Sequence, residues 1–198
     1  MATGPQFVAA LAHITGVHTA TLDRYLRNLG EAGLIRRSGK GGGKAAVHLL
    51  MYEYVTMLLS LAAIHPSGAA HAATTLEDLR DEDPATNFVS LKVTLGMAVQ
   101  LCAMEIMRGS AGRVVSNDWT LTLCLDPPQA WMSWPPHNPA PKRVFRAEQL
   151  ALLNEPAAPA LMRHTVITKP LLMLVAEHCA TWNDNAAPLP GGTASRRA

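Results

Sequence analysis

The chain has few charged side chains, few aromatic rings and few cysteines for its length. Of its 198 residues, 16% are charged and 5% are aromatic. The three cysteines are Cys102, Cys124 and Cys179; their number is odd, and no two of them are spaced as metal ligands. This pattern argues against a disulfide framework and predicts buried thiols in a cytosolic protein.

A long apolar run and a basic leader are also missing. The most apolar run, Val55 to Ile64, is too short to span a bilayer. The first residues, MATGPQFVAALAHITG, lack the basic start of a signal peptide. We therefore expect a cytoplasmic protein with no membrane partner.

The motifs of common enzyme classes do not occur either. The sequence contains no HExxH, CxxC, GxSxG, Walker or dinucleotide-binding pattern. Gly39 to Lys44 (GKGGGK) has the composition of a phosphate loop, but it lacks the GxxxxGK[ST] spacing and precedes a predicted strand. We expect no enzyme, and hence no catalytic residue, metal site or cofactor.

What the sequence does contain is an uneven distribution of charge. The net charge is only +2, but residues 18–48 hold six Lys or Arg and two Asp or Glu. This segment therefore carries +4, and the remainder of the chain about −2. Such an asymmetry indicates a local anionic partner.

The same region predicts two helices joined by a tight turn. Apolar residues recur at helical spacing in 5–15 and again in 19–32. Gly16 breaks the chain between the two helices, and Gly33 ends the second one. The leucines that line one face of the second helix are Leu22, Leu26 and Leu29.

A basic hairpin and a third helix are predicted next. Leu34 to Arg37 favours a short strand, residues 38–44 form a glycine-rich tip, and residues 45–49 return as a second strand. The third helix is expected over 51–64 and ends before the proline of His65-Pro66.

These elements together predict a surface that contacts DNA. The leucines bury one face of the second helix, which leaves its leading turns for base edges. Arg24 is suited to a bidentate contact with guanine, and Thr19 or Ala20 to a thymine methyl group. The basic residues that follow are suited to phosphates. The predicted DNA-binding residues are His18, Thr19, Ala20, Asp23, Arg24, Arg27, Asn28, Arg36, Arg37, Lys40 and Lys44.

Residues 14–35 follow the pattern ITGVHxxTLxRYLxxLxxAGLI. This resembles the winged helix-turn-helix core of bacterial transcriptional regulators, in which TGVSxxTVxRxLxxLxxxGLI is followed by a β-hairpin called the wing. The resemblance covers residues 5–50 and implies a recognition helix at 18–30 and a wing at 36–47. The glycine-rich wing and the small size also resemble prophage-encoded regulators. His18 stands where the family has Ser or Thr, so Thr19 is expected to cap the helix instead.

The second half of the chain predicts a small α+β domain. Its expected helices are a long apolar one at 88–108, a short one at 147–154 and an amphipathic one at 170–182, and the connector before it is expected to hold a short polar helix at 76–83. Its expected strands are 119–125, 130–134, 143–146 and 163–167. All four tryptophans lie in this half, where they either form the core or line a ligand pocket.

We therefore predict an α+β protein: a winged helix-turn-helix domain followed by a small α+β domain with a short antiparallel sheet. The predicted parts are a DNA-binding domain at 1–65, an acidic and Ala-rich connector at 66–85, a domain for dimerisation or for an effector or partner at 86–183, and a disordered tail at 184–198.

The expected function is sequence-specific binding of double-stranded DNA to regulate transcription, in the bacterial cytoplasm at the nucleoid. A homodimer is expected, because a two-fold protein contacts two half-sites. The apolar face of helix 51–64 is either packed within its own chain or the seam of that dimer. The alternative function is a winged-helix adaptor that contacts a protein partner, for example in phage replication or packaging, without specific DNA readout.

Overall fold

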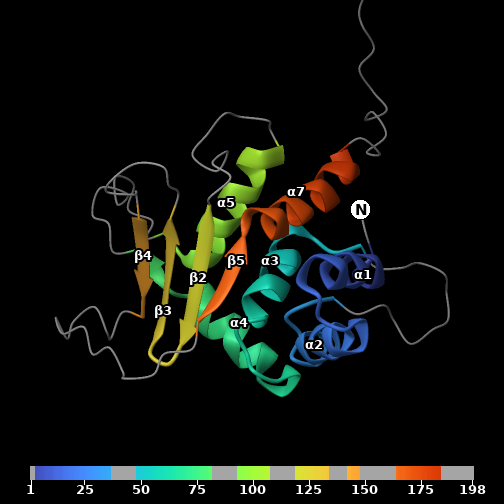
Figure 1. The fold of residues 1–198 in the computed structure, drawn as a ribbon, viewed down its shortest axis with the longest axis horizontal. Helices are drawn as coiled ribbons and strands as arrows, with labels where there is room; N and C mark the ends of the chain where they lie inside the picture. The colour runs from blue at the N-terminus through green and yellow to red at the C-terminus, as the bar shows by residue number, and fades with distance from the viewer. Residues whose placement is uncertain are drawn as a thin grey trace, which may run out of the picture.

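The chain is described by a computed structural model, which defines residues 3–36, 48–81, 93–107, 119–133, 142–147 and 164–183. Within these residues, α-helices lie on one side of an antiparallel five-stranded sheet (Figure 1). The predicted α+β class is therefore confirmed.

The two N-terminal helices agree with the sequence prediction. They are α1 (Gly4–Thr15) and α2 (Thr19–Glu31), joined by a turn of three residues. Gly16 in this turn has φ 69° and Gly33 after α2 has φ 75°, a backbone region that favours glycine. Each glycine therefore allows the chain to leave a helix at the place expected.

The start of α2 differs from the prediction in its capping residue. His18, and not Thr19, is the N-cap, and its Nδ1 accepts a hydrogen bond from the backbone N–H of Ala20 at 3.2 Å. The imidazole thus caps the helix as a serine or threonine hydroxyl would, because its nitrogen accepts from one of the unpaired amides of the first turn.

The strand expected at Leu34 to Arg37 is not found in the part that the structure describes. Residues 34–36 have no strand conformation, and Ile35 is buried in the core instead. His48, on the far side of the segment, makes an isolated antiparallel bridge with Thr3. The glycine-rich tip and most of the returning strand fall on residues 37–47, which lie outside the described residues.

Helix α3 (Met51–Ser60) is shorter than the helix predicted over 51–64. After Ser60, the amides of the next three residues donate to carbonyls three residues earlier at 3.0–3.2 Å, which tightens the chain into turns. Every residue from Glu53 to Ser60 is buried. Of the two uses considered for its apolar face, packing within the chain is the one observed.

The segment expected as a connector is instead folded where it is described. It forms the 3-10 turn η1 (Pro66–Gly68), helix α4 (Ala69–Glu77) and the short strand β1 (Arg80–Asp81). The polar helix predicted at 76–83 is therefore wrong. The buried face of α4 consists of Ala69, Ala72, Ala73 and Leu76, which recur at helical spacing.

The C-terminal half supplies helix α5 (Leu95–Met107), the other strands and helix α7 (Lys169–Asn183). The strands are β2 (Thr120–Leu125), β3 (Pro128–Ser133), β4 (Lys142–Arg146) and β5 (Thr165–Thr168). Their order in the sheet is β1-β4-β3-β2-β5, with every pair antiparallel. The helix predicted at 147–154 falls almost wholly, and the tail at 184–198 entirely, outside the described residues.

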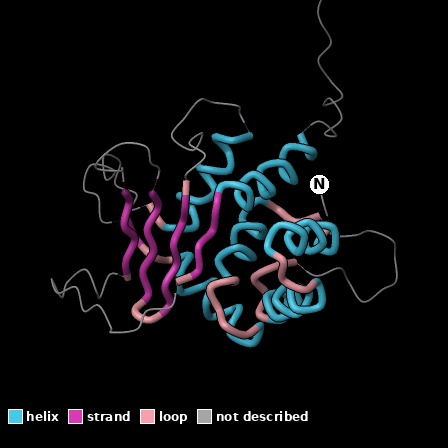
Figure 2. The backbone as a smooth tube through the Cα atoms, viewed as in Figure 1, coloured by secondary structure: helices cyan, strands magenta, loops and turns pink. Residues whose placement is uncertain are grey.

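One hydrophobic core runs through both halves of the chain. Helix α7 returns from the sheet and packs against α5, α3 and α1 (Figure 2). At that junction Phe7, Tyr54 and His178 make edge-to-face ring contacts, with centroids 4.6, 5.6 and 6.1 Å apart. The N-terminal helices are therefore part of the same packed unit as the C-terminal helix.

Candidate nucleic-acid interface

The leading turns of α2 are exposed to solvent. This surface begins at the turn after Gly16 and follows one side of the helix toward its C-terminus. Its exposed residues are His18, Thr19, Ala20, Asp23, Arg24 and Arg27, all of them predicted DNA contacts. Short side chains at the helix start and cations one turn later are suited to a helix whose N-terminal residues meet base edges.

The other side of α2 is held by the body of the protein. Leu22 and Leu29 are fully buried. The Tyr25 hydroxyl donates to the Ala63 carbonyl at 2.8 Å, and the Asn28 side-chain amide donates to the Pro66 carbonyl at 2.6 Å. Asn28 was predicted as a DNA contact, but its amide is engaged with η1. Both hydrogen bonds fix the rotation of α2 relative to α3 and α4.

The two cations of α2 differ in their surroundings. Arg24 is exposed and makes no hydrogen bond or ion pair with any residue that the structure describes. Arg27 is also exposed, one turn further on, and has an interaction of its own. Within the described residues, the donors of Arg24 are thus without a partner.

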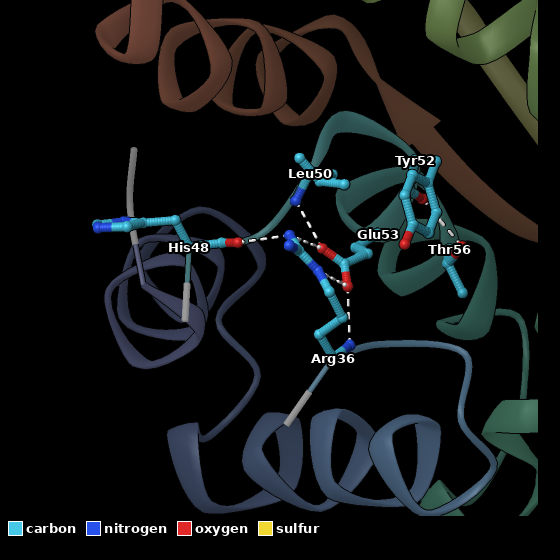
Figure 3. Close-up of polar contacts among 6 residues, drawn as sticks. All are labelled: Arg36, His48, Leu50, Tyr52, Glu53 and Thr56. Carbon is cyan, nitrogen blue, oxygen red and sulfur yellow. Dashed lines mark hydrogen bonds and ion pairs between the residues drawn. The ribbon is translucent and has the colours of Figure 1, made fainter. Parts of the chain in front are cut away.

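Arg36, the next predicted contact, binds a buried carboxylate (Figure 3). Its Nε and Nη2 donate to the two oxygens of Glu53 at 3.0 and 2.8 Å, and its backbone N–H donates to Glu53 at 2.7 Å. The Leu50 amide donates to the same carboxylate at 2.6 Å. The Glu53 side chain is 0% exposed and that of Arg36 45%. Glu53 therefore ties Arg36 to the first turn of α3.

This set of hydrogen bonds determines the ionisation of the pair. Burial by itself would raise the pKa of the Glu53 carboxyl, but the hydrogen bonds from Arg36 and from the Leu50 amide outweigh it and hold that pKa below its ordinary value. The hydrogen bond to Glu53 raises the pKa of Arg36 against the opposite effect of burial. The pair is thus a carboxylate and a guanidinium at neutral pH.

Arg36 also joins the two ends of the basic segment. Its Nη2 donates to the His48 carbonyl at 2.7 Å (Figure 3). Arg36 and His48, which flank residues 37–47, are thus held together beside Glu53. Arg37, Lys40 and Lys44, the remaining predicted contacts, lie in that segment and outside the described residues.

Two residues of this region were not predicted from the sequence. Glu53 is the single charged residue between Leu49 and Ile64, and it stands at the third position of its helix, where a glutamate reaches back to the helix N-terminus. Tyr25 interrupts the leucine pattern of α2 and carries a hydroxyl that needs a partner when buried. Both signals were present in the sequence.

Two cysteines and the candidate metal ligands are the remaining chemical groups of interest in the described residues. Burial raises the pKa of Cys102 to about 12 and that of Cys179 to about 11, so both remain thiols at neutral pH. No three His, Cys, Asp or Glu in the described ranges lie together as a metal site. Among the helices in those ranges, none has the length and apolar character needed to cross a membrane.

Comparisons with protein-family models, with curated proteins and with solved structures found no match to this chain. The function is therefore inferred from the residues and geometry of α2 and its surroundings.

Proposed function

We propose that the protein is a sequence-specific double-stranded DNA-binding regulator of transcription, with α2 as the helix that enters the major groove. In this proposal the protein acts in the bacterial cytoplasm, at the nucleoid, and binds as a homodimer. The resemblance of residues 14–35 to winged helix-turn-helix regulators agrees with this assignment.

The observation that carries the proposal is the division of α2 into two sides. One side is held by buried leucines and by the hydrogen bonds of Tyr25 and Asn28. The other side presents Thr19, Ala20 and Arg24 to solvent. A helix that reads base edges needs this combination, because it must be fixed in the domain and free along its leading turns.

The basic segment 37–47 is proposed to contact phosphates beside α2. Arg36 and the His48 carbonyl keep its two ends together. We assign Arg36 to holding the two ends of this segment rather than to a phosphate, because its Nε and Nη2 donate to Glu53 and its Nη2 donates to the His48 carbonyl as well. The phosphate contacts then belong to Arg37, Lys40 and Lys44.

Selection of genomic fragments by the purified protein at two salt concentrations tests the proposal. Enrichment of one palindromic motif that survives the higher salt is expected. Arg24→Ala should relax the preference at one base position and cost about 1 to 3 kcal/mol of discrimination. Lys169→Ala removes the same charge from the start of α7 and should leave the motif unchanged. Equal weakening of all sequences by Arg24→Ala would contradict the base-reading role.

The basic segment has a different expected signature. Lys40→Ala or Lys44→Ala should weaken binding to every sequence alike and lower the salt dependence by about one phosphate contact. The motif obtained by selection should not change.

The alternative is an adaptor that uses the same surface to contact a protein, for example in phage replication or packaging. Asp23 beside Arg24 favours it, since an acidic side chain on the leading face is repelled by phosphates but suits a basic patch on a protein. If the protein forms no complex with duplex DNA at either salt concentration, the adaptor function is favoured.

A further inference from the structure

Two neighbouring side chains of opposite charge stand in the second turn of α2. Asp23 and Arg24 are the fifth and sixth residues of this helix, and both are exposed. Within the described residues, neither of them makes a hydrogen bond or an ion pair, with each other or with a third residue. A carboxylate on a helix that is proposed to face DNA needs an explanation, because phosphates repel it.

The helical period places these two side chains on either side of the middle of the exposed face. Ala20 and Arg27, seven residues apart, lie nearly along one line of the helix, opposite the buried Leu29. At about 100° per residue, Asp23 and Arg24 each lie roughly 50° from this line, on opposite sides of it. A helix that enters the major groove along the line from Ala20 to Arg27 therefore brings Asp23 and Arg24 to different bases.

The four bases offer different partners to a carboxylate, which only accepts hydrogen bonds. In the major groove, guanine and thymine present acceptors, and adenine presents an amino group beside its N7 acceptor. Cytosine presents its N4 amino group without an acceptor. Cytosine is therefore the base whose edge suits Asp23 best. The guanidinium of Arg24, which only donates, matches the O6 and N7 acceptors of guanine.

The charge of Asp23 also discriminates between bases by repulsion. Phosphates repel the carboxylate on any sequence, so it lowers the affinity for DNA in general. The amino group of a base offsets this cost, whereas an acceptor at the same place adds to it. Selection between bases needs an unfavourable contact with the wrong base as well as a favourable contact with the right one. The carboxylate that suits a basic patch in the adaptor alternative is therefore also suited to base selection.

We propose that Asp23 is a specificity-determining residue that selects cytosine, so that each half-site bound by α2 carries a cytosine for Asp23 and a guanine for Arg24. The cytosine N4 amino group donates to the carboxylate of Asp23, and the guanidinium of Arg24 donates to O6 and N7 of guanine. This inference rests on the proposed function, because it requires α2 to lie in the major groove. It adds the class of sequence, which has G·C base pairs at the second turn of α2.

The test repeats the selection of genomic fragments with the unchanged chain and with Asp23→Asn. A side-chain amide both donates and accepts, which matches N6 and N7 of adenine. We expect the substitution to change one base position of the motif from cytosine to adenine. It should also raise the affinity for random duplex DNA, because a negative charge is lost. Asp23→Ala should lose the preference at that position without gaining another. Asp78→Asn makes the same change at the exposed end of α4 and should leave the motif unchanged.

A second measurement uses two duplexes that differ only at this base position. Replacing its cytosine by thymine should weaken binding to the unchanged chain about tenfold, because the O4 acceptor takes the place of the amino group. The same replacement should have little effect on the binding of Asp23→Ala. If Asp23 had only a structural role, both proteins would respond equally to the replaced base.

A motif that keeps all its bases in both Asp23 variants would overturn the inference and leave the proposed function intact. A change at a position that is not cytosine would have the same meaning. If the unchanged chain selects no motif, the proposed function fails and this inference fails with it. Circular dichroism shows whether the variants are folded. If Asp23→Asn does not fold, Asp23→Ala and the two duplexes decide the question.

Discussion

Glu53 is the residue on which the geometry next to α2 depends most. It accepts four hydrogen bonds, three from Arg36 and one from the Leu50 amide, although it is completely buried. A buried carboxylate is tolerated only when donors of this kind replace the water it has lost. Arg36 is 45% exposed and can be solvated by water if the ion pair is lost, whereas the buried Glu53 carboxylate cannot. Most of the free energy lost with the pair is therefore the desolvation of Glu53.

We expect Glu53→Gln to lower the free energy of unfolding by about 2 to 3 kcal/mol, because the glutamine NH2 group only donates and cannot replace the carboxylate oxygen that accepts hydrogen bonds in its place. Urea denaturation at neutral pH measures this. Glu177→Gln makes the same change at an exposed position of α7 and should stay within about 0.5 kcal/mol. An equal change in the free energy of unfolding for the two variants would contradict the structural role of Glu53.

His178 predicts a pH dependence of stability. Burial lowers its pKa from the ordinary 6.5, while its hydrogen bond with the Leu174 backbone and the charge of Glu177 act in the opposite direction. Below pH 6.5 the unfolded chain therefore takes up a proton at this position before the folded chain does, and stability falls as the pH drops. The contribution of Glu53 is lost only below 4.5, in a separate range.

Urea midpoints between about pH 8 and about pH 5 test this for the unchanged chain and for His178→Phe. The phenylalanine keeps a ring against Phe7 and Tyr54 but cannot titrate. We expect its stability to fall less on acidification. If the urea midpoints of the two proteins change equally with pH, His178 does not contribute to the pH dependence of stability.

At the scale of elements, the first turn of α2 affects both the stability of the protein and the proposed DNA binding. His18 caps the helix with a ring nitrogen, although aspartate and asparagine are better caps. His18→Asp should therefore raise the free energy of unfolding by about 0.5 to 1 kcal/mol. It should also weaken duplex DNA binding, because the new carboxylate faces phosphates.

His18→Asn is the matched variant, since it caps without charge and should keep DNA binding. Thermal unfolding and duplex titration give the two readouts. Equal DNA affinity of the Asp and Asn variants would show that this turn does not approach DNA.

The sequence predicted those elements whose apolar spacing involves large side chains. Leucines mark the buried side of α2, and alternating apolar residues mark β2. Helix α4 was misplaced because three of its four buried residues are alanines, whose spacing is regular but whose hydrophobicity is weak. The strand expected at Leu34 to Arg37 depended on local composition, whereas the backbone N–H of Arg36 donates to Glu53, a residue seventeen positions later.

The candidate site was predictable to a similar degree. Exposure of Thr19, Ala20 and Arg24 follows from the helical period, because the leucines fix which side is buried. The engagement of Asn28 with Pro66 does not follow from it, since the partner is 38 residues away and is brought close by the tertiary fold. Local patterns thus locate a helix surface but not the partners of its polar side chains.

At the scale of the whole molecule, one hydrophobic core includes buried residues from both of the parts predicted at 1–65 and 86–183. The buried residues of α1, α3, α4, α5 and α7 belong to one cluster. The face of α3 that an isolated N-terminal domain would expose is covered by α4, α5 and α7. Separating the halves would therefore expose a large apolar surface on both.

We predict that the chain unfolds in a single cooperative transition. Every tryptophan lies at or after residue 119, so fluorescence reports on the C-terminal half, whereas far-ultraviolet circular dichroism includes α1 and α2. Both signals should give the same urea midpoint, and the calorimetric and van't Hoff enthalpies should agree. A fragment of residues 1–65 should lack cooperative unfolding, because α3 has lost the helices that cover it. Two separate midpoints, or a stably folded fragment, would show that the N-terminal helices form an independent unit, and α2 would then owe its orientation to local contacts alone.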